Sequence, residues 1–300
     1  MPKESFAESF RKTVFQPGTL VLMALFVTAA WFAPRMLTTL PDLSQKPEYQ
    51  LAVTRIRITQ PPHWVPTDLV EQVVKRADLP PTLTLLNDHV VDEIANAFSL
   101  HPWVAEVVSV RKSLPAAIDV QLTYRRPVAM VQVKQGMYPV DAEGVLLPPE
   151  DFSVTDAKEY PLILDVRSTP QGPAGTSWGD ITVIGASRLA DVLSPHWKKY
   201  ELTGISVPKL TKAKSSIDDG VYILSTTAGS RITWGRAPGS QHPGELAVEQ
   251  KLGRLEKYVK DFGSFEKPHG PYEIDIRHWK CISRRSLTAN RPVENLTGIR

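Results

Sequence analysis

The histidines of this 300-residue chain are the side chains with the widest range of chemistry, and they are scattered. They stand at His63, His89, His101, His196, His242, His269 and His278. No two of them form an HxH or HExxH pattern, and a zinc site needs three or four ligands held on a rigid scaffold. The sequence therefore predicts no metal site.

Candidate nucleophiles are equally isolated. Cys281 is the single cysteine of the chain, so neither an internal disulfide nor a cysteine metal cluster can form. It falls in a predicted strand without an obvious activating partner, which favours a packing role. No Walker A or GxGxxG loop is present to hold a phosphate or a dinucleotide. A Ser-His-Asp triad is built in space and stays open at this level. We predict no catalytic residue and no cofactor.

The charge balance argues against nucleic acid as a partner. The chain has 35 Lys and Arg against 32 Asp and Glu, a net charge of +3, and no block of basic residues. Its hydrophobic content of 42% is typical of globular proteins. The length allows about two domains with additional segments.

The N-terminal region has the pattern of a membrane segment. No charged residue occurs between Thr13 and Pro34, and Leu20–Ala33 is almost wholly apolar. This pattern predicts a single transmembrane helix over residues 13–34, a cytoplasmic tail over 1–12 and a linker over 35–49. Small residues at Thr28-Ala29-Ala30 also allow a cleaved signal peptide. A buried soluble helix is the third alternative.

Residues 50–126 show the periods of strand, helix, helix, strand and strand in that order. Strands are expected at 51–59, 104–110 and 118–124, and helices at 69–74 and 90–98. The apolar residues Ile94 and Phe98 should pack on the sheet face that carries Ile118, Val120 and Leu122. Trp103 is expected in the same core.

Residues 127–285 predict a second domain with short strands and two helices. The first helix should follow a cap at Asp180 and present Ile181, Ile184 and Leu189. The second should run from Leu246 to Phe262 and end at Gly263. Residues 286–300 are polar without a period and are expected to be disordered.

Four short motifs, in order, resemble the FtsQ/DivIB family of bacterial cell-division proteins. They are Pro102-Trp103-Val104, Val110-Arg111-Lys112 with Leu114-Pro115, Arg126-Pro127-Val128-Ala129, and Asp141 with Gly144. The junction Trp234-Gly235-Arg236 and the strand Ile274-Asp275-Ile276-Arg277 add to the resemblance, whereas His278 replaces a residue that is often tyrosine. The resemblance implies an α+β protein with a POTRA (polypeptide-transport-associated) domain at 50–126 and a β domain, built on an antiparallel sheet, at 127–285.

The resemblance also implies a function. Such a protein would be a non-catalytic scaffold at the division septum, anchored in the inner membrane with its two domains outside the cytoplasm. Its expected partners are division proteins, including an FtsB/FtsL-like coiled-coil subcomplex, and neither nucleic acid nor a small-molecule substrate. Two other interpretations are a POTRA protein of outer-membrane protein transport and a membrane-anchored periplasmic enzyme.

The partner is expected to add a strand to an exposed sheet edge near the C-terminus. The candidate residues are Ile274, Asp275, Ile276, Arg277, His278, Trp279, Cys281 and Ile282. Alternation predicts that Ile274 and Ile276 are buried against the helix at 246–262, and that Asp275, Arg277 and Trp279 are wetter. The edge should be free, because few residues follow Ser283 to cover it.

Overall fold

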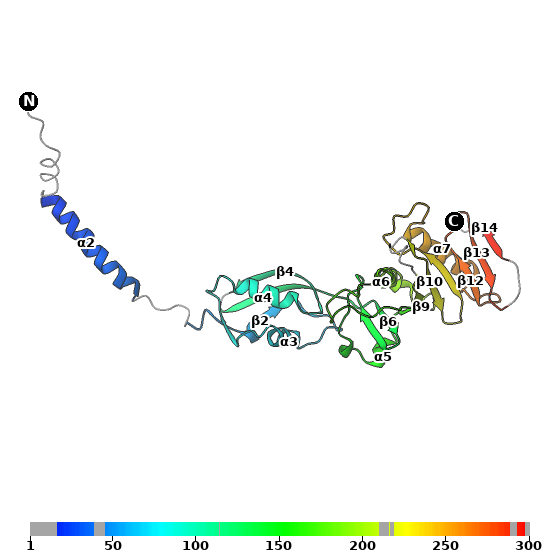
Figure 1. The fold of residues 1–300 in the computed structure, drawn as a ribbon, viewed down its shortest axis with the longest axis horizontal. Helices are drawn as coiled ribbons and strands as arrows, with labels where there is room; N and C mark the ends of the chain where they lie inside the picture. Colours follow the sequence, from blue (N-terminus) through cyan, green and yellow to red (C-terminus); the bar gives the residue numbers. More distant parts are fainter. Residues whose placement is uncertain are drawn as a thin grey trace, which may run out of the picture.

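The computed structural model describes residues 17–38, 46–113, 115–209, 216, 219–288 and 293–297. The predicted N-terminal tail at 1–12 and residues 39–45 of the predicted linker lie outside these residues. Helix α2 (Pro17–Thr38) stands apart from two lobes that follow it (Figure 1). We refer to residues 50–124 as the first lobe and to residues 129–297 as the second lobe.

The predicted transmembrane helix is corrected by the structure. Within the residues that the structure describes, no helix combines the length and the apolar character needed to span a bilayer. Helix α2 begins with Pro17, Gly18 and Thr19, so its continuous apolar run starts later than residue 13. Thr28 interrupts that run and bonds its hydroxyl back to the carbonyls of Ala24 and Leu25, both at 2.9 Å.

The first lobe combines helices with two small sheets. Strand β2 (Ile56–Ile58) pairs in parallel with β5 (Ala117–Tyr124), which pairs antiparallel with β4 (Val104–Ser113). Helices α3 (Leu69–Arg76) and α4 (Val90–Ser99) lie between β2 and β4 in the chain. A second, two-stranded sheet joins β1 (Gln50–Ala52) to β3 (Thr82–Thr84), and the turn η2 (Val53–Arg55) separates β1 from β2. The sequence did not predict β3, which falls next to Pro80-Pro81.

The core of the first lobe forms as its periodicity predicts. Ile94 and Phe98 of α4 are fully buried in one cluster with Ile118, Val120 and Leu122 of β5. Trp103 is also fully buried there, and its indole Nε1 donates a 2.7 Å hydrogen bond to Asp151. The amphipathic spacing of α4 therefore positions the sheet of this lobe.

The second lobe is built on one large sheet. In the described residues its strand order is β14-β13-β12-β11-β10-β9-β8-β6-β7. The strands are β6 (Ala129–Val133), β7 (Gly136–Val140), β8 (Leu162–Leu164), β9 (Leu202–Ser206), β10 (Tyr222–Thr226), β11 (Arg231–Gly235), β12 (Tyr272–Asp275), β13 (Cys281–Ser286) and β14 (Glu294–Thr297). The expectation of an antiparallel sheet is corrected: the sheet is mixed, because β6 with β8, β8 with β9, and β11 with β12 are parallel pairs.

Two helices provide the crossovers for parallel neighbours. Helix α6 (Ile181–Leu193) connects β8 to β9, and α7 (Val248–Phe262) connects β11 to β12 (Figure 1). Asp180 caps α6 through a 2.8 Å bond from the Thr182 N–H, and α7 ends at Gly263, whose φ of 86° suits a residue without a Cβ. Apolar residues of both helices join one cluster with the sheet. Three short elements complete the lobe: η3 (Pro149–Asp151), α5 (Val154–Ala157) and η4 (Ser194–His196).

The C-terminal residues correct a second prediction. The segment 286–300, which the sequence indicates is disordered, contains strand β14 at the end of the large sheet (Figure 1). Glu294–Thr297 pairs antiparallel with Cys281–Arg284 of β13. A polar segment without a clear period can still form a strand when a neighbouring strand supplies the ladder of hydrogen bonds.

Candidate partner-binding site at the C-terminal end of the large sheet

The predicted partner-binding residues form β12, β13 and the turn between them. Ile274, Ile276 and Ile282 are fully buried in the core of the second lobe together with Leu255 and Tyr258 of α7. Arg277 is half-buried, and His278 and Trp279 are exposed. The predicted division into buried and wetter positions is therefore confirmed.

The prediction of a free edge on this segment is wrong. Strand β12 lies between β11 and β13, and β13 lies between β12 and β14. Residues 294–297, which were expected to be disordered, instead form β14 and pair with the outer side of β13. In the described part of the chain, the last strand at this end of the sheet is β14.

Arg254 holds the turn from the side of α7. Its side chain is buried, and it donates to the carbonyls of Ile276 at 2.6 Å and Trp279 at 2.8 Å, and also to the carbonyl of His278. Burial lowers the pKa of Arg254, but a guanidinium stays protonated across the physiological range. One buried cation therefore fixes the backbone on which the exposed side chains of the turn are mounted.

A second ion pair stiffens the same turn. Arg277 donates to Asp275 from Nε at 3.0 Å and from Nη2 at 2.7 Å, and its backbone N–H donates to the same carboxylate at 2.9 Å. Burial alone would raise the pKa of Asp275, yet these bonds outweigh it and lower the pKa. This forked geometry gives the turn a defined shape.

Trp279 is the largest apolar side chain exposed on this turn. It is 61% exposed, and its indole Nε1 donates to the carbonyl of Gly244 at 3.2 Å. Large aromatic side chains of this kind supply much of the binding energy in protein interfaces. Its place on a turn held by Arg254 makes it a suitable anchor for a partner.

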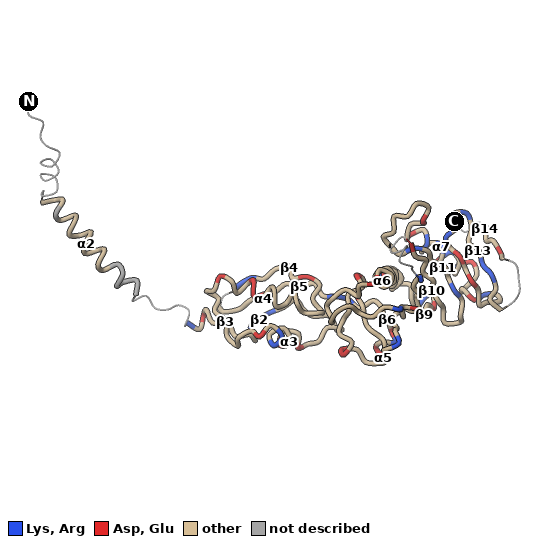
Figure 2. Tube along the Cα trace, viewed as in Figure 1, with Lys and Arg blue, Asp and Glu red and all other residues tan. Residues whose placement is uncertain are grey.

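Arg284 connects β13 to both α7 and β14. Its guanidinium lies 4.6 Å from the ring centre of Phe262 and 5.0 Å from that of Tyr272. Its Nε donates to Glu294 of β14 at 2.7 Å. Figure 2 shows basic and acidic residues close together over these last strands. The sequence analysis missed Arg284, because an arginine near a chain end gives no local signal of burial.

A buried charged cluster fixes the start of α7. Lys251 is 2% exposed and contacts Glu245, which also accepts a 3.1 Å bond from the Arg236 guanidinium. The ammonium of Lys251 lies 4.9 Å from the ring centre of Trp234. Desolvation lowers the pKa of Lys251, and the contact with Glu245 opposes that shift. The sequence does indicate that Lys251 and Arg254 are buried, because both residues fall on the apolar face of α7.

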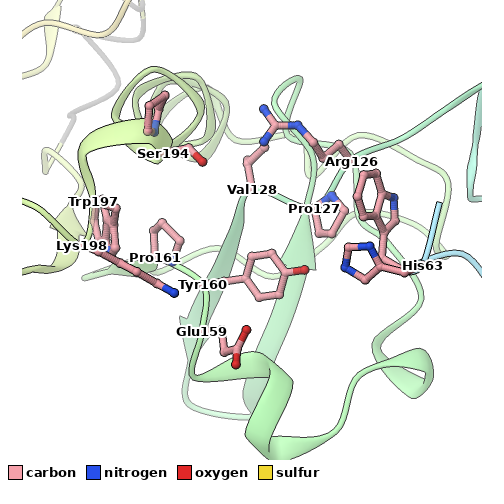
Figure 3. Close-up of a pocket in the computed structure, with 12 residues that line it drawn as sticks. His63, Arg126, Pro127, Val128, Glu159, Tyr160, Pro161, Ser194, Trp197 and Lys198 are labelled. Atoms are coloured by element: carbon pink, nitrogen blue, oxygen red, sulfur yellow. The ribbon is translucent and has the colours of Figure 1, made fainter.

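A separate pocket of about 320 Å³ lies where the two lobes meet (Figure 3). Ser194 and His63 stand on opposite sides of it, so they form no nucleophile and base pair. Burial raises the pKa of Tyr160, whose ring extends across the pocket. The lining residues are His63, Trp64, Arg126, Pro127, Val128, Glu159, Tyr160, Pro161, Ser194, Pro195, Trp197 and Lys198.

One serine, Ser177, lies in a sequence pattern that is typical of catalytic serines. Gly175-Thr176-Ser177-Trp178-Gly179 matches GxSxG, so the interpretation of the sequence as lacking this pattern was wrong. A nucleophile elbow joins a strand to a helix, whereas Ser177 lies in a loop and forms an isolated bridge with Val145. In the described part of the chain no group of three His, Cys, Asp or Glu residues could hold a metal ion.

Comparison with known proteins gives two local matches. One segment of 53 residues is 45% identical to the cell division protein FtsQ of Anaeromyxobacter sp. (strain K). A match over 62 residues is 42% identical to the cell division protein FtsQ of Koribacter versatilis (strain Ellin345). This chain resembles FtsQ. The matches cover 18% and 21% of this chain and 17% of each relative, and no family model matches.

The resemblance predicted from four short motifs is thereby confirmed at the level of shared segments. Both relatives are named as cell division proteins. Each match spans less than two thirds of its relative. The activity and partners of whole FtsQ proteins can therefore be assigned to this chain only as a proposal.

Proposed function

We propose that this chain is a non-catalytic scaffold of bacterial cell division that binds partner proteins through the C-terminal end of its large sheet. The observation that carries the proposal is the exposed Trp279 on a turn whose backbone Arg254 holds by three hydrogen bonds. The local resemblance to two cell division proteins supports the same direction.

The partner expected at this site is an FtsB/FtsL-like coiled-coil subcomplex, as the family resemblance implies. Recognition would combine the half-buried Arg277 and the exposed His278 and Trp279 with a backbone edge of the sheet. A rigid turn favours binding, because little conformational entropy is lost when the partner docks. The place of action would be the division septum.

The first lobe supplies a second contact surface in this proposal. Its order of β2, α3, α4, β4 and β5 agrees with the expected POTRA arrangement, with β1 and β3 as additions. Strand β4 is an edge strand with two register irregularities, between Val104 and Glu106 and between Val107 and Ser109. Such irregularities limit unspecific pairing at an edge.

The test is affinity capture of cross-linked partners by the full tagged chain in its host. The wild-type chain should recover cell-division proteins, and Trp279→Ala should lose most of that recovery while folding normally. The matched control is Leu100→Ala, because Leu100 is 71% exposed and lies in the first lobe. Recovery of no division protein by the wild type, or equal recovery by Trp279→Ala, would contradict the proposal.

A further inference from the structure

Among the described residues, strand β14 pairs with the large sheet on one side only, whereas its neighbour β13 is paired on both sides. It pairs with β13 over four residue pairs, from Cys281 with Thr297 to Arg284 with Glu294. Within β14, Glu294 and Asn295 are exposed, and Leu296 is the residue that packs partly on the core. A short strand with one paired edge and few apolar contacts belongs to the part of a fold that opens most easily.

Strand β13, the neighbour of β14 in the sheet, is more deeply buried. In β13, Ile282 is fully buried and Arg284 is 9% exposed, so β13 belongs to the core of the lobe. If β14 left, the N–H and C=O groups of a well-ordered strand would face solvent. Such an edge pairs readily with another extended segment.

We propose that β14 occupies the position on β13 at which a partner strand binds, and that the partner binds by displacing β14 from β13. This inference rests on the proposed function. The backbone groups that pair with the partner are those on the outer side of β13, and not those of the whole segment 274–282. The partner strand would run antiparallel to β13, as β14 does.

The contacts of β14 define the chemistry of that partner strand. Glu294 receives the Nε–H of Arg284, whose guanidinium is fixed by the rings of Phe262 and Tyr272. Two residues later, Leu296 stands opposite Ile282 and packs on the core. A displacing strand therefore needs a carboxylate and, two positions further on, an aliphatic side chain. If it pairs over more than four residues, it forms more ladder bonds than β14 and can win the competition.

The test is a tether that keeps β14 in place. Ser283 and Asn295 are register partners, so Ser283→Cys with Asn295→Cys, in a Cys281→Ser background, would lock the two strands when oxidised. In the full chain, oxidation should reduce capture of division proteins roughly tenfold or more, and reduction should restore it. The control is the Cys281→Ser chain, which should not respond to oxidation.

A second measurement uses a synthetic peptide with the sequence of residues 291–300. It should bind a chain truncated after Leu287 roughly tenfold more tightly than the full chain, because β14 competes in the latter. A peptide with Glu294→Gln should bind less tightly than the parent peptide. If the truncated chain fails to fold, the tethered full chain still decides the question.

The outcomes separate the two proposals. Equal capture of division proteins by the oxidised and reduced tether would overturn the displacement of β14 and leave the proposed function standing. Peptide binding in the truncated chain, without capture of any division protein, would support an available β13 edge while contradicting the proposed function. Concentration-dependent dimers that oxidation abolishes would overturn the inference by making a second copy of this chain the occupant.

Discussion

Arg254 shows how one buried side chain can position a surface. It lies on the apolar face of α7 and donates hydrogen bonds to three carbonyls of the turn after β12. Neighbouring Leu255 and Tyr258 are buried apolar residues of the same helix. The arginine thus links the core to the exposed residues of the candidate site.

Replacing Arg254 with Met should therefore loosen the turn. Carbonyls of Ile276 and Trp279 would lose a charged donor, and we expect a loss of about 1–3 kcal/mol in the free energy of unfolding, measured in urea. Partner capture should fall as well. Lys260→Met, an exposed change on the same helix, is the control. A variant with wild-type stability and capture would exclude this role for Arg254.

His101 gives the first lobe a pH dependence. Burial, and next the charge of Arg76, lower the pKa of His101 from 6.5 to about 4, while Asp68 acts weakly in the opposite direction. Its ring also meets the Gln72 amide at 3.2 Å and accepts the Trp103 N–H at 3.3 Å. The folded protein therefore holds this ring neutral.

The sign follows from the lowered pKa. Above pH 6.5 the ring is neutral in both states, whereas between pH 6.5 and about 4 the unfolded state binds the proton first. The free energy of unfolding should fall over that window by up to about 3 kcal/mol. His101→Gln should flatten this part of the curve, measured by denaturant unfolding at several pH values. The exposed His89→Gln is the control, and an unchanged curve for His101→Gln would contradict the assignment.

At the scale of elements, the amphipathic helices are the most reliable guides to the fold. Helix α4 buries Val90, Ile94, Ala97 and Phe98 on one side, which follows the spacing of a helix face. The same rule gives α7 its buried stripe, with Lys251 and Arg254 as charged members.

Phe98→Ala tests the packing of α4 on its sheet. Phe98 is fully buried, so the loss of the ring should cost about 3–5 kcal/mol in the free energy of unfolding. Thermal and urea unfolding of the chain would measure this change. The exposed Leu100→Ala, close by at the end of the same helix, should change stability little. A Phe98→Ala chain as stable as the wild type would rule out this packing.

The whole molecule depends on contacts between its lobes. Arg125, just after β5, donates to Asp141 at 2.7 Å, and Asp141 is 2% exposed. The Trp103 Nε1 of the first lobe donates to Asp151 of the second lobe at 2.7 Å, and Leu147 and Phe152 pack with the core of the first lobe. The lobes are therefore joined by a buried charge, a tryptophan and apolar contacts.

Arg125→Ala should weaken this junction. It leaves the buried carboxylate of Asp141 without its cation, so we expect about 3–5 kcal/mol of destabilisation. Small-angle X-ray scattering should show a larger radius of gyration, because the lobes move more freely. Arg126→Ala, which removes a half-exposed pair with Asp191, is the control. Equal scattering curves for Arg125→Ala and the wild type would refute the junction.

The sequence by itself determined the parts of this protein that depend on local periods. The spacing of Ile94 and Phe98 defined the buried side of α4, and the alternation of Ile274, Asp275 and Ile276 defined the buried side of β12. The four short motifs were enough to indicate FtsQ-like segments, which the two local matches confirm. Each of these signals lies within a few neighbouring residues.

Only the tertiary structure decided how the sheet ends and what holds its final turn. Strand β14 is stabilised by the ladder with β13 and by Arg284, so its own polar sequence carried no sign of a strand. Arg254 acquired its role because α7 lies across carbonyls that follow it by more than twenty residues. The transmembrane helix predicted over residues 13–34 was wrong for the described residues, where no helix is long and apolar enough to span a membrane, because an uncharged stretch need not be apolar over its whole length. Pairing between distant strands, and the identity of the groups that a buried cation meets, are properties of the folded chain, and no local pattern records them.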